Sequence, residues 1–241
     1  MKRNYFIAIA VTALMVASTV AQAADISFSG QFRPRFESQN DAHPDTNGRD
    51  FFSTRVRLNA TANVNANTSV FLQMQSVGNW GNAGLSTDGD NNTDRDSSIG
   101  SDVLNDIGFH QAFVTYKGIF GQAVDAKIGR QEVVLDGHRL FGHTGWTQGA
   151  QTNDAIRLNH AAGNHDLNYI YIASSEAGSL NSNANSNKDY HVIRAATEGI
   201  LGGKLTGMFI ASLDDSTAAT SEDENNFYTI GARQAGKLGG L

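Results

Sequence analysis

The sequence contains no cysteine, only two prolines and, beyond residue 23, no apolar run long enough for a membrane-spanning helix. The absence of cysteine excludes disulfide bridges and zinc sites built from thiolates. The scarcity of proline, beside 25 glycines and many Asn, Ser, Thr and Asp residues, is typical of strands joined by polar turns. Without a long apolar helix, such a chain either is soluble or enters a membrane as strands.

The first 23 residues have the pattern of a secretory signal peptide. Lys2 and Arg3 precede an apolar run over residues 5–16, and Ala21, Gln22 and Ala23 form a small-residue cleavage site. An uncleaved membrane anchor is the alternative, but the run is shorter than the roughly 20 residues that a spanning helix needs. We therefore expect residues 1–23 to be removed and residues 24–241 to form the folded domain.

The charge of the mature chain argues against nucleic acid as a partner. Without Lys2 and Arg3 it carries 16 basic and 24 acidic side chains, a net charge of −8. Heptad repeats, which would indicate long helices, are not visible.

Strict alternation of apolar and polar residues predicts strands. In residues 26–37, Ile26, Phe28, Phe32 and Phe36 share one parity, and polar or charged residues occupy most of the other. The same reading predicts ten strands, over residues 26–37, 53–64, 70–75, 109–117, 124–134, 153–160, 167–173, 190–197, 205–213 and 227–233.

The connections between these strands favour a membrane barrel. They alternate between short turns, at 65–68, 118–122, 161–165 and 198–203, and longer polar segments such as 39–50 and 80–106. Short turns at one end and long loops at the other are the layout of bacterial outer-membrane barrels. A soluble β-sandwich accounts for alternating strands equally well.

The distribution of charge decides between these two architectures. Acidic side chains crowd the long connections, whereas the polar faces of the strands are basic. The strand-borne residues that we expect to line a lumen are Arg33, Arg35, Arg55, Arg57, Gln73, Lys127 and Arg157. A sandwich gives no reason to concentrate one charge sign on its solvated face, so the segregation predicts a lined pore.

Residues 128–158 carry the most distinctive motifs, and there the chain resembles the alginate export family of outer-membrane porins. A Gly-Arg-Gln-Glu strand end at 129–132 is followed by Asp-Gly-His-Arg-Leu at 136–140, Trp146 and Asp-Ala-Ile-Arg-Leu at 154–158. The resemblance implies an all-β transmembrane antiparallel barrel of about 18 strands. This chain would supply about ten of those strands, which predicts a domain that is incomplete at its C-terminus.

We expect Arg130, Arg139 and Arg157 to form a constriction, because a guanidinium group offers forked donors to carboxylates and keeps its charge. Alternatively, these arginines pair with Glu132, Asp136 and Asp154 and only hold a loop inside the barrel. Arg130 shares the parity of Ile128, so either a bulge lies near Gly129 or Arg130 is outside the lipid band.

Metal and catalytic sites receive little support. Residues 88–99 resemble a calcium loop, but Thr93 and Ile99 replace the glycine and the glutamate that such a loop needs, so a solvated loop is favoured. His138 and His143 have no paired zinc-site spacing, and no serine has a nucleophile-elbow context. We expect no metal, no cofactor and no enzymatic activity.

The sequence thus predicts an outer-membrane porin that passes small anionic or saccharide-like solutes passively, with polyuronate export implied by the resemblance. The expected partners are outer-membrane lipid or lipopolysaccharide and the solute itself. A non-conducting barrel that presents its acidic loops as a surface adhesin or scaffold is the alternative, and a membrane enzyme is the third possibility.

Overall fold

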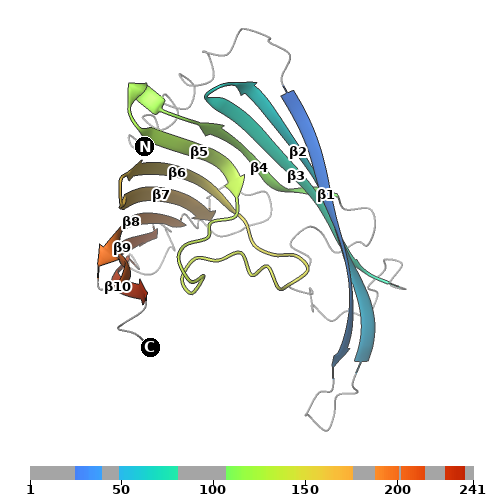
Figure 1. Ribbon diagram of the computed structural model, residues 1–241. Coiled ribbons are helices and arrows are strands. Elements are labelled where there is room, and N and C mark those ends of the chain that lie inside the picture. Colours follow the sequence, from blue (N-terminus) through green and yellow to red (C-terminus); the bar gives the residue numbers. More distant parts are fainter. Residues whose placement is uncertain are drawn as a thin grey trace, which may run out of the picture.

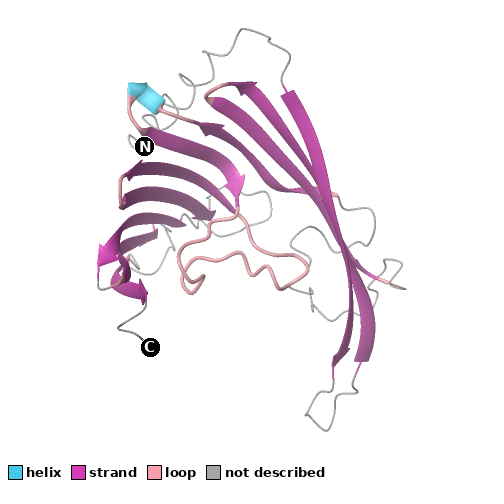
Figure 2. Ribbon diagram, viewed as in Figure 1, coloured by secondary structure: helices cyan, strands magenta, loops and turns pink. Residues whose placement is uncertain are grey.

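The computed structural model describes residues 25–39, 49–80, 107–175, 188–200, 202–214 and 226–236. These residues form one antiparallel sheet, in which every strand pairs with its neighbours in sequence (Figures 1 and 2). The strands are β1 (Asp25–Gln39), β2 (Arg49–Asn65), β3 (Thr68–Asn79), β4 (Gly108–Tyr116), β5 (Val124–Gln131), β6 (Asn153–Ala162), β7 (His165–Ser175), β8 (Lys188–Ile200), β9 (Gly203–Asp214) and β10 (Phe227–Gly236).

The all-β prediction and the ten expected strands are confirmed. The one helical element in the described ranges is the 3-10 turn η1 (Ile119–Gly121), which lies between β4 and β5. No helix of these ranges is long and apolar enough to cross a membrane. The sheet is not closed, because β1 pairs with β2 and β10 pairs with β9, and these two strands do not pair with each other.

The sheet curves strongly, so it has a concave and a convex face (Figure 1). In β2, Ser53 and Arg55 are buried on the concave side, while Val56 and Leu58 are 44% and 52% exposed on the convex side. Period-two alternation requires this separation, since neighbouring side chains of a strand point to opposite faces. Side chains therefore reach the face that their sequence parity predicts.

One β-bulge changes that parity locally. The β3–β4 ladder shifts register between Gln73 and Met74, which pair with Gln111 and Phe109 and leave His110 as the extra residue. As a result His110 and Gln111 are both buried, although they are adjacent in sequence. A bulge re-aims one side chain, and here it turns His110 towards the concave face.

The connection between β5 and β6 differs from the others. Residues 132–152, which we call the inner loop, run back into the space enclosed by the sheet (Figure 1). The strand predicted over 124–134 therefore ends earlier, at Gln131. A cluster of buried apolar side chains, which includes Ile170 and Val192, lies where this loop meets the sheet.

The close approach of β4 to β5 requires a glycine at position 129. The φ angle of Gly129 is +122°, and a Cβ atom there would lie 2.3 Å from the carbonyl oxygen of Ala112. The β5 pairings are continuous through Gly129, so the bulge that the sequence suggested here is absent from the β4–β5 and β5–β6 ladders.

We expect Gly129→Ala to lower the free energy of unfolding by about 1–3 kcal/mol or more. The alanine would have to adopt an unfavourable positive φ, and its Cβ atom would also clash with the backbone of β4. Urea unfolding followed by circular dichroism measures the effect. Gly207→Ala in β9 is the matched control, since a Cβ atom at Gly207 meets nothing within 4 Å. Equal stability of the two variants would contradict the close approach of β4 to β5.

Candidate functional site

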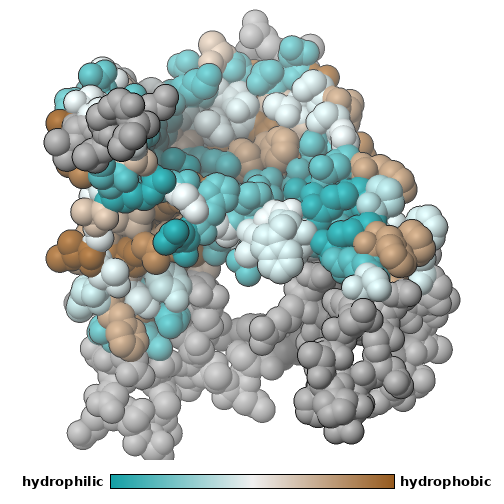
Figure 3. All heavy atoms as spheres, turned by 60° about the horizontal axis from the view of Figure 1, so that its bottom comes forward, coloured by the Kyte–Doolittle hydropathy of each residue, from teal (hydrophilic) through white to brown (hydrophobic). Residues whose placement is uncertain are grey.

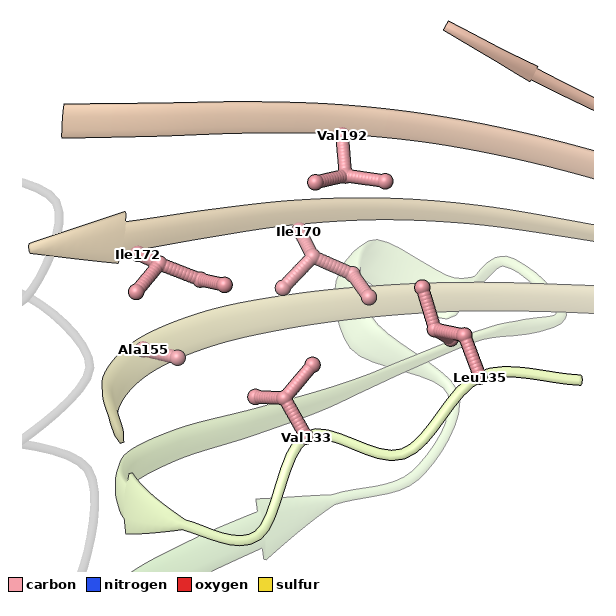
Figure 4. Packing of buried hydrophobic residues seen from close by; sticks show 6 residues of the cluster. All are labelled: Val133, Leu135, Ala155, Ile170, Ile172 and Val192. Atoms are coloured by element: carbon pink, nitrogen blue, oxygen red, sulfur yellow. The ribbon is translucent and has the colours of Figure 1, made fainter. Parts of the chain in front are cut away.

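The first half of the inner loop packs on the concave face through apolar side chains. Val133 and Leu135 are 2% and 5% exposed and contact Ile170, Ile172 and other apolar residues of β6–β8 (Figure 4). Ile170 is completely buried. Burial of one such side chain stabilises the fold by about 1.5–3 kcal/mol, so this contact holds the loop firmly.

The second half of the loop is held by arginines from β1 and β2. Arg33 donates from Nε to Oε1 of Gln148 over 2.8 Å and from Nη1 to the carbonyl of Gly145 over 2.9 Å. It also donates to the carbonyl of Thr147. These bonds join residues more than 110 positions apart, so the loop spans the concave space from β7 to β1.

Arg55 and Arg35 extend this anchoring. Arg55 donates from Nη1 to the carbonyls of Thr147 and Gln148, each over 3.3 Å, and Arg35 donates to the carbonyl of Trp146 over 2.8 Å. Arg55 is only 4% exposed. A buried guanidinium group is stable only when acceptors replace its water, and the carbonyls of the inner loop supply them.

Buried amides complete the contact between the loop and β2–β3. Gln148, 1% exposed, donates to Oγ of Ser53 over 2.8 Å, and Gln75 donates to the carbonyl of Gly149 over 2.8 Å. Each bond satisfies a polar group that would otherwise be buried without a partner.

Glu132, the first residue of the loop, lies in a charged cluster. Its Oε1 atom is 3.0 Å from Nε2 of His110 and 3.5 Å from Nη1 of Arg57, and Arg57 Nη2 is 2.9 Å from the same His110 nitrogen. Burial alone would raise the pKa of Glu132, but the hydrogen bond with His110 and the nearby charges of His143 and Arg57 lower it below its ordinary value of 4.5.

Asp136 fastens the loop to the opposite side of the sheet. Arg194 of β8 donates to both of its carboxylate oxygens, over 2.6 and 3.0 Å, and also to Asp166 of β7 over 2.7 Å. The hydrogen bond with Arg194 is the main cause that lowers the pKa of Asp136 below its ordinary value of 3.8. Both Arg194 and Asp136 have nearly buried side chains, with 6% and 10% exposed.

Backbone strain is concentrated in the same loop. Within the described residues, the non-glycine positions with positive φ are Asp136, His138, Thr144 and Ala150, at 45–62°. Such residues each cost about 1–3 kcal/mol and persist only where the surroundings hold them. The apolar and arginine contacts described above therefore keep the loop in a shape that it would not adopt alone.

The predicted site residues separate into three groups. Arg33, Arg35, Arg55 and Arg57 lie on the concave face and contact the inner loop. Gln73, Lys127 and Arg157 lie on the same face; Gln73 donates to Asn59, and Arg157 is paired in register with the buried Ile170. Arg139 is an exposed residue of the loop itself.

Arg130 lies on the convex face, as Ile128 does, whereas Lys127 lies on the concave face. It forms a two-pronged pair with Asp154, over 2.9 and 2.8 Å, and the two side chains are 49% and 56% exposed. The structure therefore does not bring Arg130, Arg139 and Arg157 together. Of the three acids considered from the sequence as partners of these arginines, Asp154 pairs with Arg130, whereas Glu132 and Asp136 pair with Arg57 and Arg194.

Several residues of the site were missed by sequence reasoning. Arg194, Gln75 and His110 are buried on the concave face and hold the loop or its first residue. The parity of Gln75 matches that of Gln73, so this residue was predictable. His110 was not, because only the bulge in β4 turns it inward.

Viewed from the end that carries the inner loop, hydrophilic side chains gather across the middle of the molecule (Figure 3). Hydrophobic side chains lie mainly at its margins in this view. No group of three or more potential metal-ligating side chains occurs in the part of the chain that the structure describes. The acidic segment 88–99 lies outside that part.

A family model described as alginate export matches residues 24–240. No curated protein matches the chain significantly.

We expect Ile170→Ala to lower the free energy of unfolding by about 2–5 kcal/mol, because it leaves a cavity beneath Val133 and Leu135. Hydrogen exchange in residues 132–152 should rise in this variant. Ile193→Ala, on the convex face of the adjacent strand and 46% exposed, is the matched control and should leave exchange in the loop unchanged. Unchanged exchange in both variants would mean that the apolar contact does not hold the loop.

The lowered pKa values of Glu132 and Asp136 predict how the loop responds to acid. Each carboxylate stabilises the docked loop fully above its ordinary pKa, and this stabilisation is lost as the pH falls through the lower pKa of the folded protein. In a Trp80→Phe background, where Trp146 is the remaining tryptophan, its fluorescence anisotropy should stay constant from pH 7 to 4.5 and decrease below that. Asp136→Asn should show a smaller acid-induced decrease in anisotropy. A decrease in the wild-type protein already between pH 7 and 5 would contradict the assignment of the acid response to Glu132 and Asp136.

Proposed function

Because the chain belongs to the alginate export family, a family of outer-membrane proteins, we propose that its sheet forms part of the wall of an outer-membrane channel for anionic solutes. The concave face would line the lumen and the convex face would contact lipid. Passage would be passive, with solutes of the polyuronate or smaller saccharide-acid type as cargo. Lipid or lipopolysaccharide and the solute itself would be the partners.

The separation of the two faces carries this proposal. Large apolar side chains of β1 and β2 point outward and are widely exposed, among them Phe28 at 71%, Phe32 at 67% and Leu58 at 52%. A soluble protein rarely exposes such a continuous apolar surface, whereas a lipid-facing barrel wall requires it. The arginines of the same strands point inward, and on a lipid face each would cost roughly 2–4 kcal/mol at mid-membrane.

The position of the inner loop supports a channel whose lumen is narrowed. It crosses the concave space between β1 and β8 and is fixed at both sides by arginines, through Gln148 and Asp136. A loop that folds into a barrel reduces the free cross-section and brings solutes close to the wall. Charges near the path then determine which ions pass, since charges beyond about 10 Å are screened at 0.1 M salt.

A non-conducting scaffold is the competing proposal, and one observation favours it. The concave face of β6–β8 carries an apolar cluster that the inner loop covers, so this part of the interior is filled rather than open. A complete barrel whose interior is filled throughout would present its outer loops and conduct nothing.

Planar-bilayer recordings of the intact protein separate the two proposals. We expect a stable conductance whose reversal potential in a KCl gradient indicates anion preference at low salt. The double change Arg33→Gln and Arg55→Gln should loosen the inner loop and raise the conductance several-fold, because removing charge-assisted bonds weakens its anchoring. Arg130→Gln is the matched control, since Arg130 lies on the convex face. No conductance in either the wild type or the double variant would favour the scaffold.

A further inference from the structure

Strand β1 lies at one edge of the sheet (Figure 1), and among the described strands it pairs with β2 alone. Backbone groups of successive residues in a strand point to alternate sides, so every second residue of β1 directs its N–H and C=O away from β2. Unpaired backbone groups are not tolerated in contact with hydrocarbon. In the membrane wall proposed above, another strand must therefore pair with β1, and we call the line where the two strands meet the seam.

Two observations identify the residues of β1 that face the seam. The carbonyl of Phe52 accepts a hydrogen bond from the backbone N–H of Trp80 over 2.7 Å, so the even-numbered residues of β2 face β3 and the odd-numbered ones face β1. A Cβ atom at Gly30 would lie 3.0 Å from the carbonyl oxygen of Arg57, which agrees with this assignment. Arg57 pairs in register with Gln31, so the odd-numbered residues of β1 bond to β2 and the even-numbered residues face the seam.

Pro34 interrupts the row of donors along the seam. It is one of the even-numbered residues of β1, and proline has no N–H group. The nearest donors on this edge are the amides of Phe32 and Phe36, which are about 14 Å apart, twice the spacing in a regular strand. Proline occurs in edge strands where its missing donor faces away from the existing ladder, as it does here. A strand that pairs with β1 therefore lacks one hydrogen bond at Pro34, and the seam is weakest there.

Apolar side chains border this weak position on the convex face. Phe32 and Phe36, on either side of Pro34, are 67% and 55% exposed. β1 continues from here to the long connection that joins it to β2, so Pro34 lies in the half of the wall nearer to the long loops. In an outer membrane, that half of a barrel contacts the outer leaflet. The acyl chains of this leaflet therefore lie against the weakest part of the seam.

An exposed tryptophan lies on the concave side of the same position. Arg33 precedes Pro34 and donates to the carbonyl of Gly145 over 2.9 Å. Arg35 follows Pro34 and donates to the carbonyl of Trp146 over 2.8 Å. These bonds fix the backbone of the inner loop behind Pro34, and the side chain of Trp146 is 78% exposed. An indole ring on a fixed backbone offers an apolar contact to a molecule that enters beside β1.

We propose that the seam at Pro34 is a lateral opening in the channel wall, through which the acyl chain of an outer-leaflet lipid reaches the lumen. Phe32 and Phe36 border the opening on the lipid side, and Trp146 contacts the acyl chain on the lumen side. A molecule with an apolar chain and a polar head fits this opening, because it joins an apolar exterior to a lumen with polar side chains. This inference rests on the proposed channel function and adds a path between the lumen and the membrane.

Quenching of tryptophan fluorescence by brominated lipid tests the opening. In the Trp80→Phe background, the intact protein in vesicles of lipid that is brominated on its acyl chains should show quenched Trp146 fluorescence, relative to vesicles without bromine. Pro34→Thr restores the missing donor and should lower this quenching about 2- to 10-fold, the factor by which one hydrogen bond shifts an equilibrium. Absence of quenching with Pro34 in place, or quenching that Pro34→Thr leaves unchanged, would overturn the opening.

Gly78→Thr is the matched control for the substitution. Pro34, Thr54 and Gly78 are successive register partners, so position 78 lies in the same row on a strand that is paired on both sides. A Cβ atom at Gly78 meets nothing within 4 Å, and Gly78→Thr should leave the quenching of Trp146 unchanged. A decrease as large as that in Pro34→Thr would mean that the added threonine, and not the seam, causes the effect.

Hydrogen exchange tests the seam without any variant. In the intact protein, the amide of Phe36 should exchange about 10-fold faster than that of Phe28 or more, because weakly paired edges open locally. The amides of Arg35 and Glu37 face β2, so they are the internal control for fraying of the strand end and should stay protected. Equal protection of Phe28 and Phe36 would contradict a weak seam at Pro34.

The remaining outcomes separate the lateral opening from the channel function. Conductance of an intact protein in which brominated lipid does not quench Trp146 would overturn the opening and leave the channel standing. Quenching that depends on Pro34 in a protein without conductance would support the opening and overturn the channel. Conductance together with such quenching would support both.

Discussion

The structure depends on the need of inward-facing arginines for hydrogen-bond acceptors. Once Arg55 is nearly buried, an unpaired guanidinium group would cost several kcal/mol, so polar atoms must come to it. The sheet offers the Gln31 amide at 2.6 Å, and the inner loop offers carbonyls. In return the loop gains bonds that hold it in a strained shape, with positive φ at Thr144 and Ala150. The arginines and the loop therefore stabilise each other, and neither arrangement is favourable alone.

The loop is held by two kinds of interaction that respond differently to conditions. Its first half is fixed by apolar burial around Ile170, which is insensitive to pH and salt. Its second half is fixed by charge-assisted hydrogen bonds from Arg33 and Arg55, and Arg194 adds such bonds to Asp136 in the first half. Ion pairs with exposed partners, such as Arg130–Asp154, contribute only about 0–1 kcal/mol by comparison. Position inside the curved sheet, more than the number of arginines, determines which of them shape the loop.

Alternation in the sequence was enough to predict the strands and the faces of the early ones, because period two leaves little choice once one face is apolar. It was insufficient where both faces of a strand are apolar. Residues 169–172 read Tyr-Ile-Tyr-Ile, and only the packing of the inner loop explains why Ile170 and Ile172 face inward. Such a continuous apolar run indicates a strand covered on both sides. His110 and Arg194 could not be assigned at all, since their roles depend on a bulge and on a loop aspartate.

The acceptors around an arginine side chain can satisfy its hydrogen bonds without neutralising its positive charge. Among the described residues, Arg55 donates to amide and carbonyl oxygens, which satisfy its donors and leave its positive charge intact. Arg57 and Arg194 instead meet carboxylates, so their fields are largely cancelled at a distance. An arginine can thus hold a loop and still contribute to an anion-attracting potential, provided that its acceptors are neutral. The charge that a solute meets on the concave face is therefore set by the kind of acceptor each arginine finds, and a count of basic residues in the strands overestimates it.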